Sequence, residues 1–195
     1  MQMGTQLAVK VLVAGGFGAG KTTLVNTVSE IQTLRTEEML TSESVGVDDT
    51  SGVEQKTTTT VAMDFGRITL GDGLVLYVFG TPGQKRFWFM WDELAVGSIG
   101  AVVLADTRRL ADCFSSIDFF ERRGMPFIVG LNRFEGAAQP DIEAVRSALD
   151  LDPHVPVITC DARERESVKQ VLITLVEHVL GTRQRQRQRS AAYQA

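Results

Sequence analysis

A glycine-rich segment near the start of the chain constrains the fold more than any other feature. Residues 15–22 read Gly-Gly-Phe-Gly-Ala-Gly-Lys-Thr, directly after the apolar run at 7–14. A strand that leads through such a turn into a helix directs backbone N–H groups and a helix N-terminus at one point, where a polyphosphate can bind. Lys21 then reaches the β- and γ-phosphates, and the Thr22 hydroxyl binds Mg²⁺. The alternative is a glycine-rich turn without a ligand. The residues expected to bind a nucleoside triphosphate here are Gly15, Phe17, Gly18, Ala19, Gly20, Lys21, Thr22 and Thr23.

The rest of the chain alternates between patterns typical of strands and of helices. The patterns predict strands at 7–14, 61–70, 73–80, 99–105, 126–131 and 155–160, and helices at 21–31, 84–97, 109–123, 140–149 and 165–180. Such alternation indicates a mostly parallel sheet. The turn at 71–73, Gly-Asp-Gly, joins the second and third strands as a hairpin. We therefore expect an α/β protein with the three-layer sandwich of P-loop NTPases: a mostly parallel six-stranded sheet, one antiparallel edge strand, and helices on both faces.

Length and charge divide the chain into one domain and a tail. A chain of 195 residues is one domain by length, which we place at 1–182. Residues 183–195 contain alternating arginine and glutamine and no acid, which predicts a disordered basic tail. Residues 1–182 carry 16 basic and 24 acidic side chains, a net charge of −8, so nucleic acid is not an expected partner. The basic residues of the tail are Arg183, Arg185, Arg187 and Arg189.

The sequence also indicates where the protein resides. No apolar stretch is long enough to cross a bilayer. Cys113 and Cys160 lie far apart and lack the spacing of metal ligands, so we expect them to be reduced. These features favour a cytoplasmic protein. The arginine tail is either solvated or in weak peripheral contact with anionic lipid at the inner face of the cell membrane.

Three further segments follow predicted strands, at the sheet edge where open parallel sheets bind ligands. They read Gly-Thr-Pro-Gly-Gln at 80–84, Asn-Arg-Phe-Glu at 132–135 and Cys-Asp-Ala-Arg at 160–163. In order and spacing, the phosphate loop and these segments resemble the phosphate loop, switch II motif, base-recognition motif and last base-contact loop of a bacterial Ras-like small GTPase. The resemblance covers about residues 7–181. It is closest to the gliding-motility (Mgl-type) and actinobacterial conservon-type P-loop GTPases, in which Thr-Pro-Gly-Gln follows the third strand.

The resemblance implies an enzyme, a GTP hydrolase that acts as a molecular switch. It would bind GTP with Mg²⁺, hydrolyse it slowly to GDP, and signal to protein partners through switch I and switch II. The implied catalytic residues are Gly83, which offers its N–H to the γ-phosphate, Gln84, which orients the attacking water, and Lys21. Thr60, the last of four successive threonines, would bind Mg²⁺ in switch I, with Thr59 as the alternative.

Five residues are implied in recognition of the base. Guanine presents two N–H donors to a single carboxylate, whereas adenine does not. Glu135 stands where the family has an aspartate, and Arg133 and Arg163 stand where it has lysines. Asn132 would brace the phosphate loop, and the Ala162 N–H would meet guanine O6. A plain loop at these positions is the alternative that the residues leave open.

Two residues depart from the Ras pattern. Gly80 replaces the aspartate that holds Mg²⁺ through water, so Mg²⁺ should depend on Thr22, the phosphates, and either a switch threonine or Asp106. Phe17 stands where Ras has a very small residue that admits an arginine from the activating partner. We therefore expect an activator to reorient switch II and to place an arginine of this chain, such as Arg86.

The resemblance also implies partners. These are guanine nucleotide, a roadblock-type activating protein and membrane-associated signalling components. Trp88 and Phe89, beside switch II, would form a protein-binding patch or lie under neighbouring segments. Two other functions stay open. One is a catalytically inert pseudo-GTPase scaffold that holds nucleotide, which Gly80 and Phe17 favour. The other is an ATP-using P-loop enzyme, which Glu135 opposes.

Overall fold

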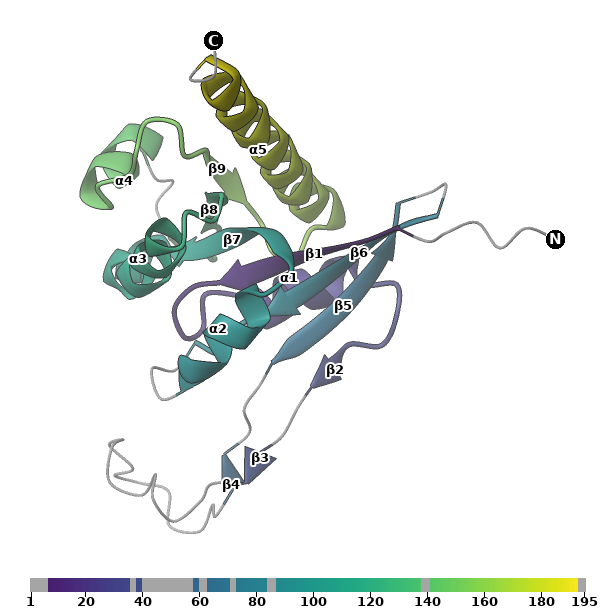
Figure 1. Cartoon of the computed structure of the whole chain (residues 1–195). Helices are drawn as coiled ribbons and strands as arrows, with labels where there is room; N and C mark the ends of the chain where they lie inside the picture. The colour runs from purple at the N-terminus through teal and green to yellow at the C-terminus, as the bar shows by residue number, and fades with distance from the viewer. Residues whose placement is uncertain are drawn as a thin grey trace, which may run out of the picture.

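The computed structural model describes residues 7–35, 38–39, 58–59, 63–70, 73–83, 87–137 and 141–192 (Figure 1). The strands are β1 (Leu7–Ala14), β2 (Leu34–Arg35), β3 (Glu38–Met39), β4 (Thr58–Thr59), β5 (Asp64–Thr69), β6 (Leu74–Gly80), β7 (Ser98–Asp106), β8 (Phe127–Asn132) and β9 (Val157–Cys160). The helices are α1 (Lys21–Val28), α2 (Phe89–Ala95), the 3-10 helix η3 (Thr107–Cys113), α3 (Phe114–Arg122), α4 (Ile142–Ala148) and α5 (Arg165–Ala192).

The main sheet confirms the expected fold class. Its strand order is β2-β5-β6-β1-β7-β8-β9. Strand β1 pairs in parallel with β6 and β7, and β8 and β9 continue the parallel set. Strand β5 is antiparallel to β6, as the hairpin predicts. The sheet differs from the expectation in one detail, because the two-residue strand β2 pairs outside β5.

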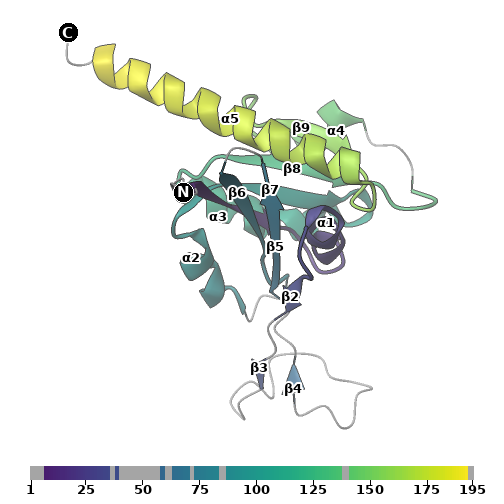
Figure 2. The same ribbon diagram turned by 90° about the vertical axis from the view of Figure 1, so that its right-hand side faces the viewer.

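Helices cover both faces of the sheet, so the three layers are also confirmed (Figures 1 and 2). Alternate residues of β1 point to opposite faces, because side chains alternate along a strand. Leu12 belongs to the core beneath α2, α3 and α4, whereas Val11 and Val13 belong to the core beneath α1 and α5. Burial on both sides explains why β1 is apolar almost throughout. The strand therefore delivers its carboxyl end, and the phosphate loop after it, to the middle of the sheet edge.

Several helix ends differ from the predicted ones, and three of the differences bear on the site or the tail. A 3-10 helix, η3, precedes α3, and its helical run is broken at Arg109. Helix α2 begins at Phe89, whereas we expected a helix from 84, and residues 84–86 lie outside the described part of the chain. Helix α5 continues to Ala192, beyond the expected end at 180, so most of the segment expected to be disordered is helical here (Figure 2).

The extension of α5 has a simple physical reason. Arginine and glutamine have good helix propensity. Extending a helix that already exists avoids the cost of nucleation, and the first half of α5 is fixed by packing against the sheet. Composition alone therefore overstated disorder at this end of the chain. None of the helices in the described residues has the length and apolar character needed to span a membrane.

The core makes a testable prediction at Phe120. This α3 residue is fully buried and contacts the rings of Trp91, Phe119 and Phe127. Phe120→Ala should lower the free energy of unfolding by about 3–5 kcal/mol, because it removes a large apolar side chain and leaves a cavity. Urea denaturation at fixed nucleotide and Mg²⁺ concentrations measures the change. Phe114→Ala, at a position 42% exposed, is the matched control, and an equal loss there would contradict the assignment of the core.

Candidate nucleotide-binding site

The phosphate loop lies between β1 and α1, where the sequence predicts it. Its last glycine, Gly20, has a φ of 102° and caps α1. A Cβ at Gly20 would lie 2.5 Å from the Asn132 amide nitrogen, so only glycine allows β8 to approach the loop this closely. The loop is thus fixed by the strand that precedes it, the helix that follows it, and a side chain from β8.

Lys21 curls back over the loop. Its Nζ donates to the carbonyl oxygens of Gly15, at 2.9 Å, and Gly16, at 2.7 Å. Burial lowers the pKa of Lys21 to about 8, and the nearby Asp64 carboxylate opposes part of that shift. A phosphate bound at the loop would stabilise the charged ammonium. The Lys21 ammonium is therefore held against the phosphate loop, and its contact with the phosphates stays a prediction.

A carboxylate that sequence reasoning missed lies beside Thr22. Thr22 Oγ1 donates to Asp64 Oδ2 at 2.5 Å, and Asp64 is only 2% exposed. Asp64 belongs to β5 and pairs directly with Gly80 of β6. A Cβ at Gly80 would lie 3.2 Å from both Cβ and Oδ2 of Asp64. A carboxylate from the neighbouring strand therefore lies next to position 80, where the Ras pattern has an aspartate, and the absence of a side chain at Gly80 leaves room for it.

Asp106, the other predicted source of a carboxylate for Mg²⁺, is engaged elsewhere. Its oxygens accept hydrogen bonds from the backbone N–H, Nε and Nη2 of Arg108, at 2.8–2.9 Å. These bonds hold the pKa of Asp106 below its usual range. The expected route through Asp106 therefore lacks support in this structure. The Thr22 hydroxyl and the Asp64 carboxylate lie together beside the phosphate loop, and both supply the oxygen ligands that Mg²⁺ prefers.

The described residues contain no cluster of three or more histidine, cysteine or acidic side chains that could hold a metal by itself. This is compatible with Mg²⁺, which takes few ligands from protein and most of the rest from phosphates and water. Thr22 and Asp64 thus fit an ion that is completed by a bound nucleotide. Thr60 lies outside the described residues, and of the alternative Thr59 the structure places only the backbone, in β4.

The switch II segment meets the phosphate loop at Gly83. A Cβ at this residue would lie 2.8 Å from Lys21 Nζ and 3.2 Å from the Phe17 Cα. Gly83 therefore lies close to both Lys21 and the phosphate loop, and its role at the γ-phosphate stays a prediction. Gln84 and Arg86 fall outside the described residues, so their roles stay predictions.

Helix α2 follows switch II and presents aromatic residues on two sides. Trp91 is buried, donates from Nε1 to the Pro82 carbonyl at 3.1 Å, and packs against α3. Trp88 and Phe89 are exposed, which excludes burial under neighbouring described segments. Their predicted use by a protein partner remains a prediction.

A pocket of about 400 Å³ adjoins the loop and is lined by all five predicted base-contact residues. Asn132 braces this pocket from within. Its Nδ2 donates to the Ala19 carbonyl at 3.0 Å, and its Oδ1 accepts the Ala162 N–H at 2.9 Å. The Ala162 N–H, which we expected at guanine O6, is thus engaged by Asn132 in this structure. The residues that line the pocket are Gly18, Gly20, Thr23, Arg108, Asn132, Arg133, Phe134, Glu135, Asp161, Ala162 and Arg163.

Two of the charged side chains in this pocket, Arg163 and Asp161, already pair with each other. Arg163 donates through Nε and Nη2 to both oxygens of Asp161, at 2.9 and 2.8 Å, and this lowers the pKa of Asp161 to about 2. Arg108 lies over the ring of Phe134, at 4.0 Å from its centre. Arg108, Phe134 and Asp161 also line the pocket, and sequence reasoning gave none of them an individual role. The predicted carboxylate, Glu135, does line the pocket.

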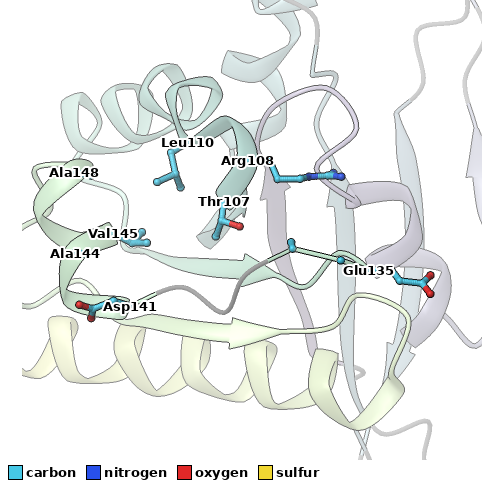
Figure 3. A pocket seen from close by; sticks show the side chains of 10 residues that line it. Thr107, Arg108, Leu110, Glu135, Asp141, Ala144, Val145 and Ala148 are labelled. Atoms are coloured by element: carbon cyan, nitrogen blue, oxygen red, sulfur yellow. The ribbon is translucent and has the colours of Figure 1, made fainter.

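A second and larger hollow, of about 630 Å³, lies next to the base pocket and shares Arg108 and Glu135 with it (Figure 3). Its far end is formed by α4, where Ala144 and Val145 face Leu110 of η3 (Figure 3). The hollow contains none of the phosphate-loop residues, so it is distinct from the predicted triphosphate site.

Comparison with known structures supports the fold. The G-domain of FeoB from Methanococcus jannaschii matches with a TM-score of 0.58 and 14% identity, over 89% of this chain and 98% of that one. The small GTPase Arl6 (BBS3) from Trypanosoma brucei, solved with the nucleotide analogue GppNp, matches with a TM-score of 0.62 and 19% identity, over 88% of this chain and 97% of that one. These likenesses show a P-loop GTPase fold, whereas the Mgl-type or conservon-type assignment stays a prediction.

Comparison of sequences adds the family. An uncharacterized protein of Methanocaldococcus jannaschii is 32% identical over 127 residues, which cover 64% of this chain and 70% of that protein. The family described as "Conserved hypothetical ATP binding protein" matches residues 13–182, which include the phosphate loop, Gly80, Gly83 and the base pocket. The chain therefore belongs to this conserved hypothetical ATP-binding protein family, and it has the fold of the P-loop GTPases.

Proposed function

We propose that this protein is a guanine-nucleotide switch that binds GTP with Mg²⁺ and hydrolyses it slowly to GDP. The observation that carries the proposal is the position of Glu135, which lines a pocket that also contains Gly18 and Gly20 of the phosphate loop. A base in that pocket would be joined to phosphates at the loop. In a fold of this kind the protein supplies positioning and electrostatics, and turnover without an activator can be as slow as about 10⁻⁴ s⁻¹.

The choice of base rests on hydrogen-bond chemistry. A carboxylate accepts the N1–H and N2–H₂ donors of guanine, whereas the corresponding edge of adenine presents the N1 acceptor, which a carboxylate repels. The family description names ATP, so ATP is the second candidate ligand. Within the pocket, both oxygens of Asp161 already accept hydrogen bonds from Arg163. Glu135 is therefore the carboxylate that we assign to the nucleotide base.

Mg²⁺ would be held by Thr22 and, directly or through water, by Asp64. When bound, the ion would draw negative charge from the phosphates. The chain itself positions the reacting groups: Lys21 at the phosphates, Gly83 at the γ-phosphate, Gln84 at the attacking water, and Thr60 of switch I over the metal. The contact of Gly83 with Phe17 and Lys21 supports this arrangement, because a γ-phosphate beside Lys21 would press directly on switch II.

The proposed partners are a roadblock-type activating protein and membrane-associated signalling components, as in the Mgl-type and conservon-type GTPases. Phe17 is 67% exposed at the rim of the phosphate loop, where its ring would obstruct an arginine inserted by a partner. The exposed Trp88 and Phe89 offer a contact surface next to switch II instead. We place the protein in the cytoplasm, with the exposed arginines of α5 in weak contact with anionic membrane.

Base choice can be tested at Glu135. The wild-type chain should bind GTP and GDP in calorimetry at millimolar Mg²⁺, should bind ATP far more weakly, and should release phosphate slowly from GTP. Glu135→Gln should weaken GTP binding by about 10–100-fold, because the amide presents a donor to guanine N2–H₂. The same variant should gain affinity for xanthosine triphosphate, whose 2-oxo group accepts from that amide. Glu143→Gln, at an exposed position on α4, is the matched control. Tight ATP binding that Glu135→Gln leaves unchanged would refute the guanine assignment.

The proposed role of the Asp64 carboxylate can be tested by removing it and by placing an aspartate at residue 80 instead. Asp64→Gly should lower the gain in GDP affinity that Mg²⁺ provides by about 10–100-fold, because it removes an oxygen donor beside the metal. The double variant Asp64→Gly, Gly80→Asp should restore much of that gain, since residues 64 and 80 are directly paired. Titration of GDP in Mg²⁺ and in EDTA measures both effects. Full Mg²⁺ dependence in Asp64→Gly would show that Asp64 has no part in holding the ion.

Lys21 predicts a pH dependence of binding. In the protein without nucleotide, burial lowers the pKa of Lys21 to about 8, and a bound polyphosphate would raise that pKa by favouring the charged form. Binding should therefore take up roughly half a proton at pH 8, and affinity should fall as the pH rises above that value. Calorimetry at pH 8 in two buffers of different ionisation enthalpy measures the uptake. Binding that releases protons, or none at all, would contradict the position of Lys21 at the phosphates.

A further inference from the structure

The outer side of the phosphate loop is backed closely by η3. A Cβ at Gly16 would lie 2.5 Å from the Asp112 Cβ and 3.0 Å from Asp112 Oδ2. A Cβ at Gly18 would lie 3.3 Å from Arg109 Nη2. The phosphate-loop pattern leaves both positions open to other residues, so phosphate binding alone does not account for two more glycines. Close contact with Asp112 accounts for Gly16, whereas Gly18 has a φ of 74°, a backbone conformation that favours glycine.

Arg109 makes the central contact of this packing. Its Nη2 donates to the Phe17 carbonyl at 2.6 Å. Its Nε lies 3.7 Å from Asp112 Oδ2 and 4.0 Å from Asp106 Oδ2. The guanidinium thus bridges two carboxylates of the β7–η3 segment and one peptide of the phosphate loop. A planar, permanently charged fork suits such a bridge, because it can donate in several directions at once.

The same segment reaches the base pocket through Arg108. Asp106 is buried and accepts three hydrogen bonds from Arg108, whose guanidinium lies over the Phe134 ring. Asp106 therefore supports one arginine at the base pocket and a second at the phosphate loop. Neither arginine is part of the phosphate-loop pattern or of the predicted base contacts.

The bond to Phe17 has a consequence for the peptide that joins Phe17 to Gly18. This peptide is trans, and in a trans peptide the C=O and the following N–H point in opposite directions. Fixing the Phe17 oxygen on Arg109 therefore directs the Gly18 N–H away from Arg109, to the other side of the loop. A loop that binds phosphate needs its N–H groups held in such a fixed orientation.

We propose that Arg109 is a positioning residue that clamps residues 16–18 from outside and thereby sets how long a nucleotide stays bound. This inference rests on the proposed function in so far as a nucleotide occupies the loop. The clamp acts on the loop and not on the reacting phosphate. It therefore affects GDP and GTP alike and leaves the chemical step unchanged.

Release of a fluorescently labelled GDP from the full-length protein, chased with excess GDP, tests the clamp. Arg109→Ala should release the label about tenfold faster than wild type, because a charge-assisted hydrogen bond to the loop is lost. Arg109→Lys should give an intermediate rate, since it keeps the charge but not the fork. Single-turnover hydrolysis of bound GTP by Arg109→Ala should stay within about twofold of wild type. The control is Arg122→Ala, at an 81% exposed side chain on α3, and it should release the label at the wild-type rate.

Two results would overturn the clamp. One is equal release of the label by wild type and Arg109→Ala. The other is unchanged release together with a loss of hydrolysis of about 100-fold or more, which would mean that the guanidinium acts on the triphosphate itself. If Arg109→Ala does not fold, Asp112→Asn should still speed release, by about threefold, because it weakens the hold on Arg109. A wild-type protein that retains no nucleotide would instead refute the proposed function, and the clamp with it.

Discussion

The two hydrogen bonds of the Asn132 amide hold the candidate site together. Its nitrogen donates to Ala19 in the phosphate loop, and its oxygen accepts from Ala162 in the loop after β9. Asn132 is buried, so breaking either bond would leave a polar group away from water. One side chain at the end of β8 therefore joins the phosphate side of the site to the base side. The strand order, which sets β8 between β7 and β9, is what makes this possible.

In this site the position of a functional group in space matters more than its position in the sequence. The Ras pattern has an aspartate at residue 80, whereas here the Asp64 carboxylate lies on the neighbouring strand, in space that Gly80 leaves open. Likewise, the phosphate loop is supported by arginine and aspartate side chains of η3 that belong to no nucleotide-binding pattern. A motif with a missing member can thus keep its chemistry through a neighbour.

Most of the fold could be predicted because its signals are local. The phosphate loop follows a strand that is buried on both faces, and the Gly-Asp-Gly sequence at 71–73 predicts the antiparallel pairing that β5 and β6 have. Residue 64 of β5 pairs with residue 80 of β6, so the register of the predicted hairpin could have identified Asp64 from the sequence. Arg109 could not be identified in this way, because its hydrogen bond to Phe17 joins residues 92 positions apart from within a break in η3, which no local sequence pattern predicts. The length of α5 was underestimated because a composition typical of disorder also has high helix propensity.

The close packing of Gly83 on Lys21 has a thermodynamic consequence for any switch built on this fold. If a terminal phosphate displaces this glycine, then the free energy of that displacement appears equally in phosphate binding and in the choice of switch II conformation. A partner protein that binds only one conformation of switch II must then change the affinity for nucleotide by some factor. The nucleotide must change the affinity for that partner by the same factor. Lys21 and Gly83, which lie side by side, would then be enough to couple the two binding events.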